Sequence, residues 1–243
     1  MKLFTFSKRC TKEILRDPLN LLFGLGFPIV LLLLLSAIQA NVPATLFEIH
    51  KLAPGICVFG LSFITLFSAT LIARDRESAL LQRLYTTPLR AADYILGYMI
   101  PMLPIAAAQG AVCSLIAIAL GLDINANILF AVILLIPVSV LYIGLGLLCG
   151  SVFNLKQVGG ICGALLTNLS AWLSGVWFDL ELVGGTFRKI ANILPFVHGV
   201  ELQRAAIGGN FQEIITHLPI VLLYDTIILI GASCLFLRQM KKQ

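Results

Sequence analysis

The sequence predicts an all-α polytopic membrane protein with six transmembrane helices. Its residues are 59% hydrophobic and its mean hydropathy is +0.97, well above the apolar share of soluble domains. A soluble core of 243 residues cannot hide that much apolar surface, so lipid must be the solvent for much of it. The apolar runs are long and lack strand-like alternation, which favours helices over a β-barrel because each helix satisfies its own backbone hydrogen bonds.

Six apolar runs are long enough to cross a hydrocarbon layer about 30 Å thick. The prolines within or beside these runs are expected at kinks or near helix ends, where neighbouring helices can satisfy the freed backbone groups. The expected spans are residues 19–39, 52–73, 95–120, 127–150, 158–177 and 218–237, and the prolines are Pro28, Pro101, Pro104, Pro137 and Pro219.

An amphipathic helix is expected over residues 1–17, before the first span. At helical period its apolar residues fall on one face and its basic residues on the other. Such a helix is typical of a segment lying in the cytoplasmic membrane interface. A disordered basic tail is the alternative, and the continuous apolar stripe argues against it. The apolar residues are Leu3, Phe4, Phe6, Cys10, Ile14 and Leu15.

The distribution of basic residues predicts the orientation. If the N-terminus is cytoplasmic, thirteen of the 17 lysines and arginines fall on the cytoplasmic side. The positive-inside rule therefore places both termini in the cytoplasm and predicts a multi-pass protein of the cell (plasma) membrane. The net charge of +5 reflects this topology and does not indicate nucleic-acid binding.

The segment 178–217, between the fifth and sixth spans, is expected on the outer side and is half apolar. We interpret it as a helix pair, 183–194 and 196–207, divided at Pro195. Such a pair can dip into the outer membrane face as a re-entrant hairpin when protein neighbours cover it. An ordinary pair of surface helices is the alternative. The whole chain, 1–243, is then a single transmembrane domain.

A charged segment interrupts the apolar sequence in the cytoplasmic loop 74–94, between the second and third spans. Residues 78–85 can form a short helix in which leucines provide an apolar centre inside a charged rim, as in many protein interfaces. The residue before Pro88 disfavours helix, which ends this element. A solvated loop that only fixes topology is the alternative. The residues expected to contact a partner are Asp75, Arg76, Glu77, Leu80, Leu81, Arg83, Leu84, Thr87 and Pro88.

This segment resembles the ERExGTLExLxxTP signature of the ABC type-2 permeases, the membrane subunits of ATP-binding-cassette exporters. Asp75 and Glu77 stand for the two acids of the signature, whereas Ala79, Leu80 and Gln82 depart from it. The matching residues are Leu81, Leu84, Thr87 and Pro88, followed by Asp93 and Gly97, which resemble the acid and glycine that open the next span.

A second stretch is similar to the SG…LP…eaLR region of the same family. It comprises Leu173-Ser174-Gly175, Ile193-Leu194-Pro195-Phe196 and Glu201-Leu202-Gln203-Arg204. The Phe-Pro that usually follows the fifth span is Phe178-Asp179 here. The two motifs occur in the family order, and the resemblance covers essentially the whole chain.

The resemblance implies a homodimer or heterodimer of six-span subunits with two ATP-binding cassette subunits docked on the cytoplasmic face. The charged segment would be the coupling helix that fits a groove of the ATPase. No GxxxxGK[ST] phosphate-binding loop occurs, so ATP and Mg²⁺ belong to the partner, and this chain is expected to hold no cofactor and to be no enzyme by itself. The implied function is export of a small amphipathic molecule, drug or peptide. Polysaccharide or lipid export by the same family is the alternative.

Polar and small residues in the fifth span predict that it faces the dimer seam and the transport path, since small residues let helices approach closely. The residues concerned are Asn168, Ser170 and Ser174, with glycines at 159, 160 and 163. Trp172 fits an aromatic belt at the interface, with substrate contact as the alternative.

Asp225 is the one acid well inside a span and is a functional candidate, because an ionisable residue in lipid is costly. A helix-packing hydrogen bond is the alternative role. An ion-coupled transporter or channel that uses Asp225 is the rival from another functional class. The three histidines (His50, His198 and His217) are scattered and are interpreted as surface or interfacial residues, and the six cysteines as small apolar filler without metal-ligand spacing.

Overall fold

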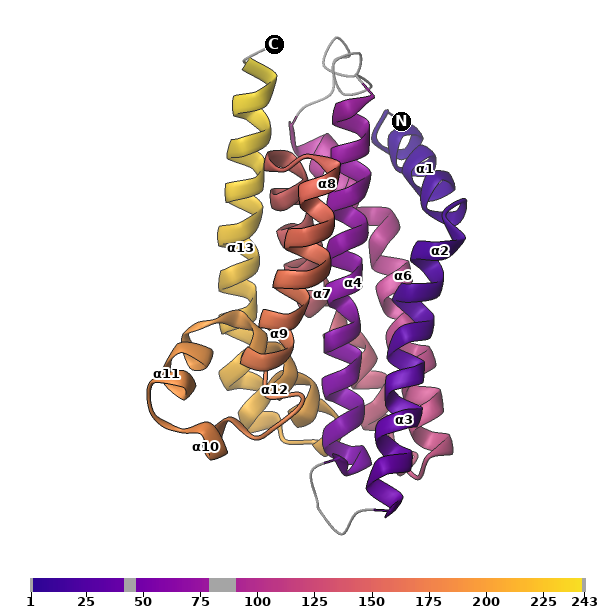
Figure 1. Cartoon of the computed structure of the whole chain (residues 1–243), viewed down its shortest axis with the longest axis vertical. Coiled ribbons are helices and arrows are strands. Elements are labelled where there is room, and N and C mark those ends of the chain that lie inside the picture. The colour runs from indigo at the N-terminus through magenta and orange to yellow at the C-terminus, as the bar shows by residue number, and fades with distance from the viewer. Residues whose placement is uncertain (1, 42–46, 79–90, 242–243) are drawn as a thin grey trace.

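The structure is a computed structural model that describes residues 2–41, 47–78 and 91–241. Helices form all the regular structure of these described residues, arranged as an elongated bundle (Figure 1). The N-terminal helix and the C-terminus lie at the same end of the bundle.

The described elements run in the order α1 (Lys2–Leu15), α2 (Pro18–Leu21), the π-helix η1 (Leu22–Gly26), α3 (Phe27–Asn41), α4 (Ile49–Glu77), α6 (Ala91–Ala119), α7 (Ala126–Val152), α8 (Leu155–Val158), the π-helix η3 (Gly159–Leu166), α9 (Thr167–Leu173), α10 (Leu180–Val183), α11 (Gly185–Ile193), α12 (Pro195–Gly208) and α13 (Phe211–Lys241).

Among the described residues, five helices are long and apolar enough to cross a membrane, which agrees with an all-helical membrane protein and gives candidates for five of the expected spans. The remaining expected span, 158–177, corresponds to the shorter helices α8, η3 and α9, which end at Leu173. A count of six spans and the side on which each terminus lies stay predictions. The five spans are Leu22–Asn41, Ile49–Glu77, Ala92–Ala119, Ala126–Val152 and Phe211–Arg238.

Helix α4 is the centre of the bundle and packs on α3, α6, α7, α12 and η3. Its contact with α7 is close because α7 presents glycines there. A Cβ on Gly146 would lie 2.4 Å from the carbonyl oxygen of Thr65, and one on Gly150 would lie 2.5 Å from that of Ala69. The Thr65 hydroxyl donates a hydrogen bond to the Tyr142 carbonyl of α7 at 2.8 Å. Small residues and a hydroxyl therefore hold α4 and α7 together.

The expected helix pair divided at Pro195 is confirmed, as α11 and α12. Leu194 between them is extended, with φ −85° and ψ 151°, and Pro195 occupies the first turn of α12, where its missing N–H costs nothing. Helix α12 is largely buried against α4, α7 and α13. Its position relative to a membrane stays a prediction.

Helix α1 is amphipathic, as expected, but only part of its apolar face is buried against the bundle. Phe6, Cys10 and Ile14 are buried against the bundle, but Phe4 and Leu15 are 73% and 62% exposed. At about 100° per residue, Phe4 and Leu15 lie at one edge of that face, beside the basic residues, and form an exposed apolar strip. Helix α1 thus has a buried apolar face and an exposed apolar strip.

Candidate functional site at the end of α4

Asp75 lies in the last turn of α4 and is buried, with 1% of its surface exposed. Both carboxylate oxygens accept hydrogen bonds from the Arg9 guanidinium of α1, with Nη2 to Oδ1 at 2.5 Å. The Tyr98 hydroxyl of α6 donates to Oδ2 at 2.7 Å. A buried carboxylate is stabilised when charge-assisted and neutral donors satisfy both of its oxygens, as they do here.

Arg9 carries this interaction on the polar side of α1. Its guanidinium also pairs with Glu13, one turn further along the helix, at 2.5 Å. Burial alone would lower the pKa of Arg9, but the hydrogen bond and charge of Asp75 raise it above its ordinary value. Arg9 therefore stays charged and fastens α1 to the end of α4.

Arg76 and Glu77 fasten the end of α4 to two further helices. Nη1 of Arg76 donates to the carbonyl oxygens of Gly150, at 2.9 Å, and Ser151, in the last turn of α7. A cation is favourable there because the last carbonyls of a helix have no partner within it. The Glu77 carboxylate accepts a hydrogen bond from the backbone N–H of Leu155, the first residue of α8, at 2.8 Å. An anion is favourable at that position for the complementary reason.

Three consecutive charged residues thus connect α4 to α1, α6, α7 and α8. They were expected to face an ATPase partner, but Asp75 is buried and Arg76 is partly buried, whereas Glu77 is exposed. The other expected contacts lie outside the described residues, so their role stays a prediction. These are Leu80, Leu81, Arg83, Leu84, Thr87 and Pro88.

A model of the ABC-2 type transporter family matches residues 1–207, a stretch that includes this site. The chain belongs to the ABC-2 type transporter family. It is therefore the membrane-spanning permease subunit of an ABC transporter, of the kind that works with an ATP-binding cassette subunit. A search of curated proteins found no match.

The second group of expected site residues in the permease divides between two environments. Asn168 and Trp172 are both exposed on α9, on the side that faces away from the bundle. Ser170 and Ser174 are buried and donate to the backbone carbonyls of Thr167 and Ala171 on their own helix, at 2.9 and 3.1 Å. The exposed pair, and not the serines, is therefore available to a second subunit or a cargo.

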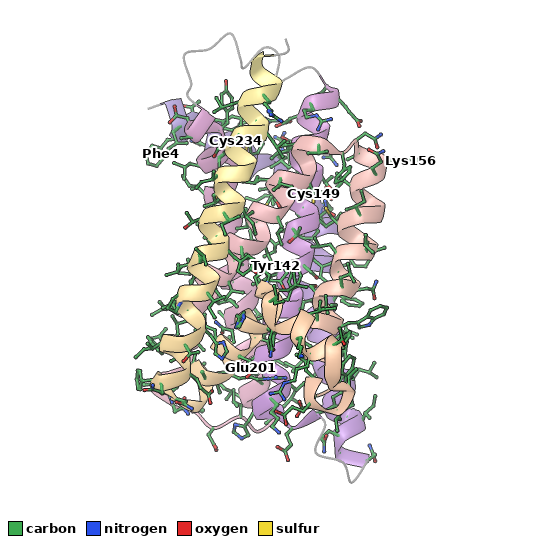
Figure 2. The ribbon with its side chains drawn as sticks, turned by 90° about the vertical axis from the view of Figure 1, so that its left-hand side faces the viewer. Phe4, Tyr142, Cys149, Lys156, Glu201 and Cys234 are labelled. Carbon is green, nitrogen blue, oxygen red and sulfur yellow. The ribbon has the colours of Figure 1, made fainter. Side chains whose placement is uncertain are left out.

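Asp225 of the permease lies on α13, whose main neighbours are α7 and α12. Figure 2 shows α13 on one side of the bundle and the α8–α9 segment, marked by Lys156, on the other. The structure therefore does not bring Asp225 together with Asn168 and Trp172. Asp225 is 6% exposed, and its Oδ1 has no hydrogen-bond partner among the described residues.

The interpretation of all three histidines as surface or interfacial residues is wrong for His198. His198 is 9% exposed, and its Nδ1 lies 2.9 Å from Nδ1 of His217, while its Nε2 lies 2.9 Å from the Asn192 carbonyl oxygen. Five of the six cysteines are buried, as expected of small apolar filler.

The sequence alone did not identify two residues that contact Asp75. Arg9 entered only as one of many basic residues, and Tyr98 did not enter at all. No sequence spacing relates Arg9, Asp75 and Tyr98, because they lie on three helices. A local signal did exist for the α4–α7 contact: Gly146 and Gly150 are four residues apart, the GxxxG spacing that lets membrane helices approach closely.

Proposed function

We propose that this permease is the membrane half of an ATP-driven exporter and that its ATPase docks on the cytoplasmic loop 74–94. The observation that supports the proposal most is the set of contacts made by Asp75, Arg76 and Glu77, at the point where α4 enters that loop. These contacts lead from the loop into four other helices. A docking element must be joined to the spans in this way if its displacement is to move them.

In this proposal two ATP-binding cassette subunits serve two permeases, as a homodimer or heterodimer. ATP binding closes the ATPase pair and displaces both loops. The bonds to Gly150 and Leu155 carry that displacement to α7 and to the α8–α9 segment. The change is a shift between two populated conformations, so ATP must bind the closed arrangement more tightly than the open one.

The exposed side of η3 and α9 is the proposed dimer seam and transport path. Leu165 and Trp172 are 56% and 51% exposed there, and Asn168 is exposed between them. Asn168 Nδ2 bonds to the carbonyl oxygen of Ala164 at 2.8 Å, which leaves its amide oxygen available. A polar amide is unfavourable against lipid, which favours a second subunit or a water-filled path beside this face.

The proposed cargo is a small amphipathic molecule, drug or peptide. The same face offers it apolar contact with Trp172 and Leu165 and a hydrogen bond to the amide oxygen of Asn168. Export of a polysaccharide or a lipid is the alternative within the family. A cargo panel assayed in vesicles with the assembled transporter separates these classes, because only the true cargo stimulates ATP hydrolysis and accumulates.

Docking and transmission are tested separately by two variants of the full chain, co-expressed with its candidate ATP-binding cassette subunit. Leu84→Asp places a charge at the expected apolar centre of the docking helix, and we expect co-purification of the ATPase to be lost. Glu77→Ala removes the bond to Leu155. We expect it to keep the complex but to lower cargo-stimulated ATP hydrolysis about tenfold.

Glu181→Ala is the matched control, since Glu181 is an exposed acid whose only described ion pair is with Arg188, far along the chain from the loop. It should behave as the wild type in both assays. A complex that survives Leu84→Asp would move the docking site away from the loop and contradict the proposal.

Asp225 supports a second candidate function of another class, an ion-coupled transporter or channel. Its carboxyl is buried in a spanning helix, with Oδ1 unpartnered among the described residues, which suits a group that binds a proton or cation in transit. Transport by the purified permease without any ATPase, driven by an ion gradient and abolished by Asp225→Asn, would favour this function. Transport that needs the ATPase and survives Asp225→Asn would exclude it.

A further inference from the structure

A groove of about 800 Å³ opens beside α1, where α1, α2 and the last turns of α4 meet. Helix α1, which supplies most of its lining, lies at the same end of the bundle as the C-terminus (Figure 1). Basic side chains dominate its walls. The lining residues of α1 are Thr5, Lys8, Arg9, Lys12, Glu13 and Arg16, and those beyond it are Asp17, Pro18 and Arg74.

The charges in this groove are not balanced. Arg9 is occupied by Asp75 and Glu13, and Arg74 lies 3.6 Å from Asp17. Lys8, Lys12 and Arg16 are exposed, and none of them forms an ion pair with another described residue. They recur at four-residue spacing, so they lie along one side of α1. Three uncompensated cations therefore face one concave space of a size that fits a phosphorylated group.

The exposed apolar strip of α1 indicates that the groove lies beside lipid. Phe4 and Leu15 lie next to Lys8 and Lys12 around the helix, and Figure 2 shows Phe4 at the outer edge of the bundle. Exposed apolar side chains beside a row of cations are typical of a helix at the boundary between acyl chains and headgroups. A soluble phosphate ester would contact only the cations, whereas a phospholipid would contact the cations with its phosphate and the apolar strip with its acyl chains.

We propose that this groove is a binding site for the headgroup of an anionic phospholipid. The phosphate binds Lys8, Lys12 and Arg16, and the acyl chains lie along Phe4 and Leu15. Arg9 forms the inner wall, so the bound headgroup lies one side chain away from Asp75 and the end of α4.

The site is tested by titrating the purified, delipidated full chain with short-chain phosphatidylglycerol and, separately, with phosphatidylcholine, and counting bound lipids by native mass spectrometry. We expect a saturable phosphatidylglycerol site with at least tenfold preference over phosphatidylcholine. Each cation near an anionic headgroup contributes about fivefold in affinity. The triple variant Lys8→Gln, Lys12→Gln, Arg16→Gln should therefore weaken phosphatidylglycerol binding by roughly 100-fold.

Two controls test whether a loss of binding comes from the cations of this groove. The first tests for a general effect of positive charge, and the second for misfolding caused by substitution at these positions. Lys51→Gln, Lys156→Gln, Lys189→Gln removes the same number of exposed cations elsewhere and should leave the affinity unchanged. Lys8→Arg, Lys12→Arg, Arg16→Lys retains the charges and should retain binding. Equal losses in the first control and in the test variant would overturn the proposal.

Two further outcomes would assign the groove to another ligand. If glycerol phosphate competes as well as the lipid does, the site binds a soluble phosphate ester and the lipid proposal is wrong. If the triple variant binds phosphatidylglycerol normally but no longer co-purifies with the ATP-binding cassette subunit, the groove is a protein contact and the lipid proposal is wrong.

Discussion

Asp75 joins helices to one another because its carboxylate is buried between them. Its carboxylate is shared by Arg9 and Tyr98, so α1 is attached to the bundle through a charge that has almost no access to water. Removing one partner of a buried ion pair leaves the other charge uncompensated, which costs more than the pair contributed.

We therefore expect Asp75→Asn to loosen α1, and Cys10 is a natural reporter. Cys10 lies on the buried face of α1 with no exposed surface, and burial raises the pKa of its thiol to about 12, so it reacts slowly while α1 is docked. A weakening of about 2 kcal/mol raises the open population roughly thirtyfold. In a chain that retains Cys10 as its sole cysteine, maleimide labelling should accelerate accordingly.

Arg74→Gln is the matched control for that measurement. Arg74 is the neighbour of Asp75, but its pair with Asp17 is longer, at 3.6 Å, and about half exposed. Such pairs contribute little. Equal labelling rates in the wild type and Asp75→Asn would show that α1 is held by its apolar face alone.

Gly146 allows α4 and α7 to pack closely because it has no side chain. A Cβ there would lie 1.9 Å from Ser68 Oγ and 2.4 Å from the Thr65 carbonyl oxygen, so α4 and α7 would have to move apart. We expect Gly146→Ala to lower stability by about 1–3 kcal/mol, seen as a lower apparent melting temperature in detergent. Gly208→Ala is the control, because its Cβ meets nothing within 4 Å. Equal melting temperatures for the two variants would contradict close packing at Gly146.

At the scale of elements, the end of α7 is stabilised by a residue from another helix. Arg76 donates to the carbonyls of Gly150 and Ser151 in the last turn of α7, where a helix supplies no further backbone N–H groups of its own. We expect Arg76→Gln to raise amide hydrogen exchange over residues 148–153 by about tenfold, since a charge-assisted bond contributes about 1.5 kcal/mol or more. The exposed Arg238 provides the control, Arg238→Gln. Unchanged exchange at 148–153 would show that Arg76 of α4 does not stabilise the end of α7.

The elements differ in how far the sequence could predict them. The spans and the division at Pro195 were predictable because apolar period and proline act locally, on the segment that carries them. The amphipathic face of α1 was predictable for the same reason, but its division into a buried part and an exposed strip was not, because only tertiary packing distinguishes Cys10 from Leu15. The same limit applies to the site: the motif identified Asp75, Arg76 and Glu77 as important, but their partners Arg9, Gly150 and Leu155 are distant in sequence.

At the scale of the whole molecule, the exposed face of η3 and α9 suits neither lipid nor water. The outer side of η3 and α9 exposes Leu165 and Trp172 together with the amide of Asn168. The exposed sides of α3 and α13, by contrast, present leucines and isoleucines such as Leu34 and Ile227, which lipid covers without loss. The face with Asn168 is therefore where we place the second permease of the proposed dimer.

Disulfide cross-linking in membranes tests that placement. Leu165→Cys and Ile227→Cys are introduced one at a time into a Cys234→Ser background, which removes the exposed native thiol. The two positions have nearly equal exposure, 56% and 55%, so reactivity alone does not distinguish them. We expect Leu165→Cys to form a dimer on mild oxidation and Ile227→Cys to stay monomeric, because a disulfide forms only when two Cα atoms come within about 7 Å. The reverse result would place the seam on α13, the helix that carries Asp225, and would contradict a seam at Asn168.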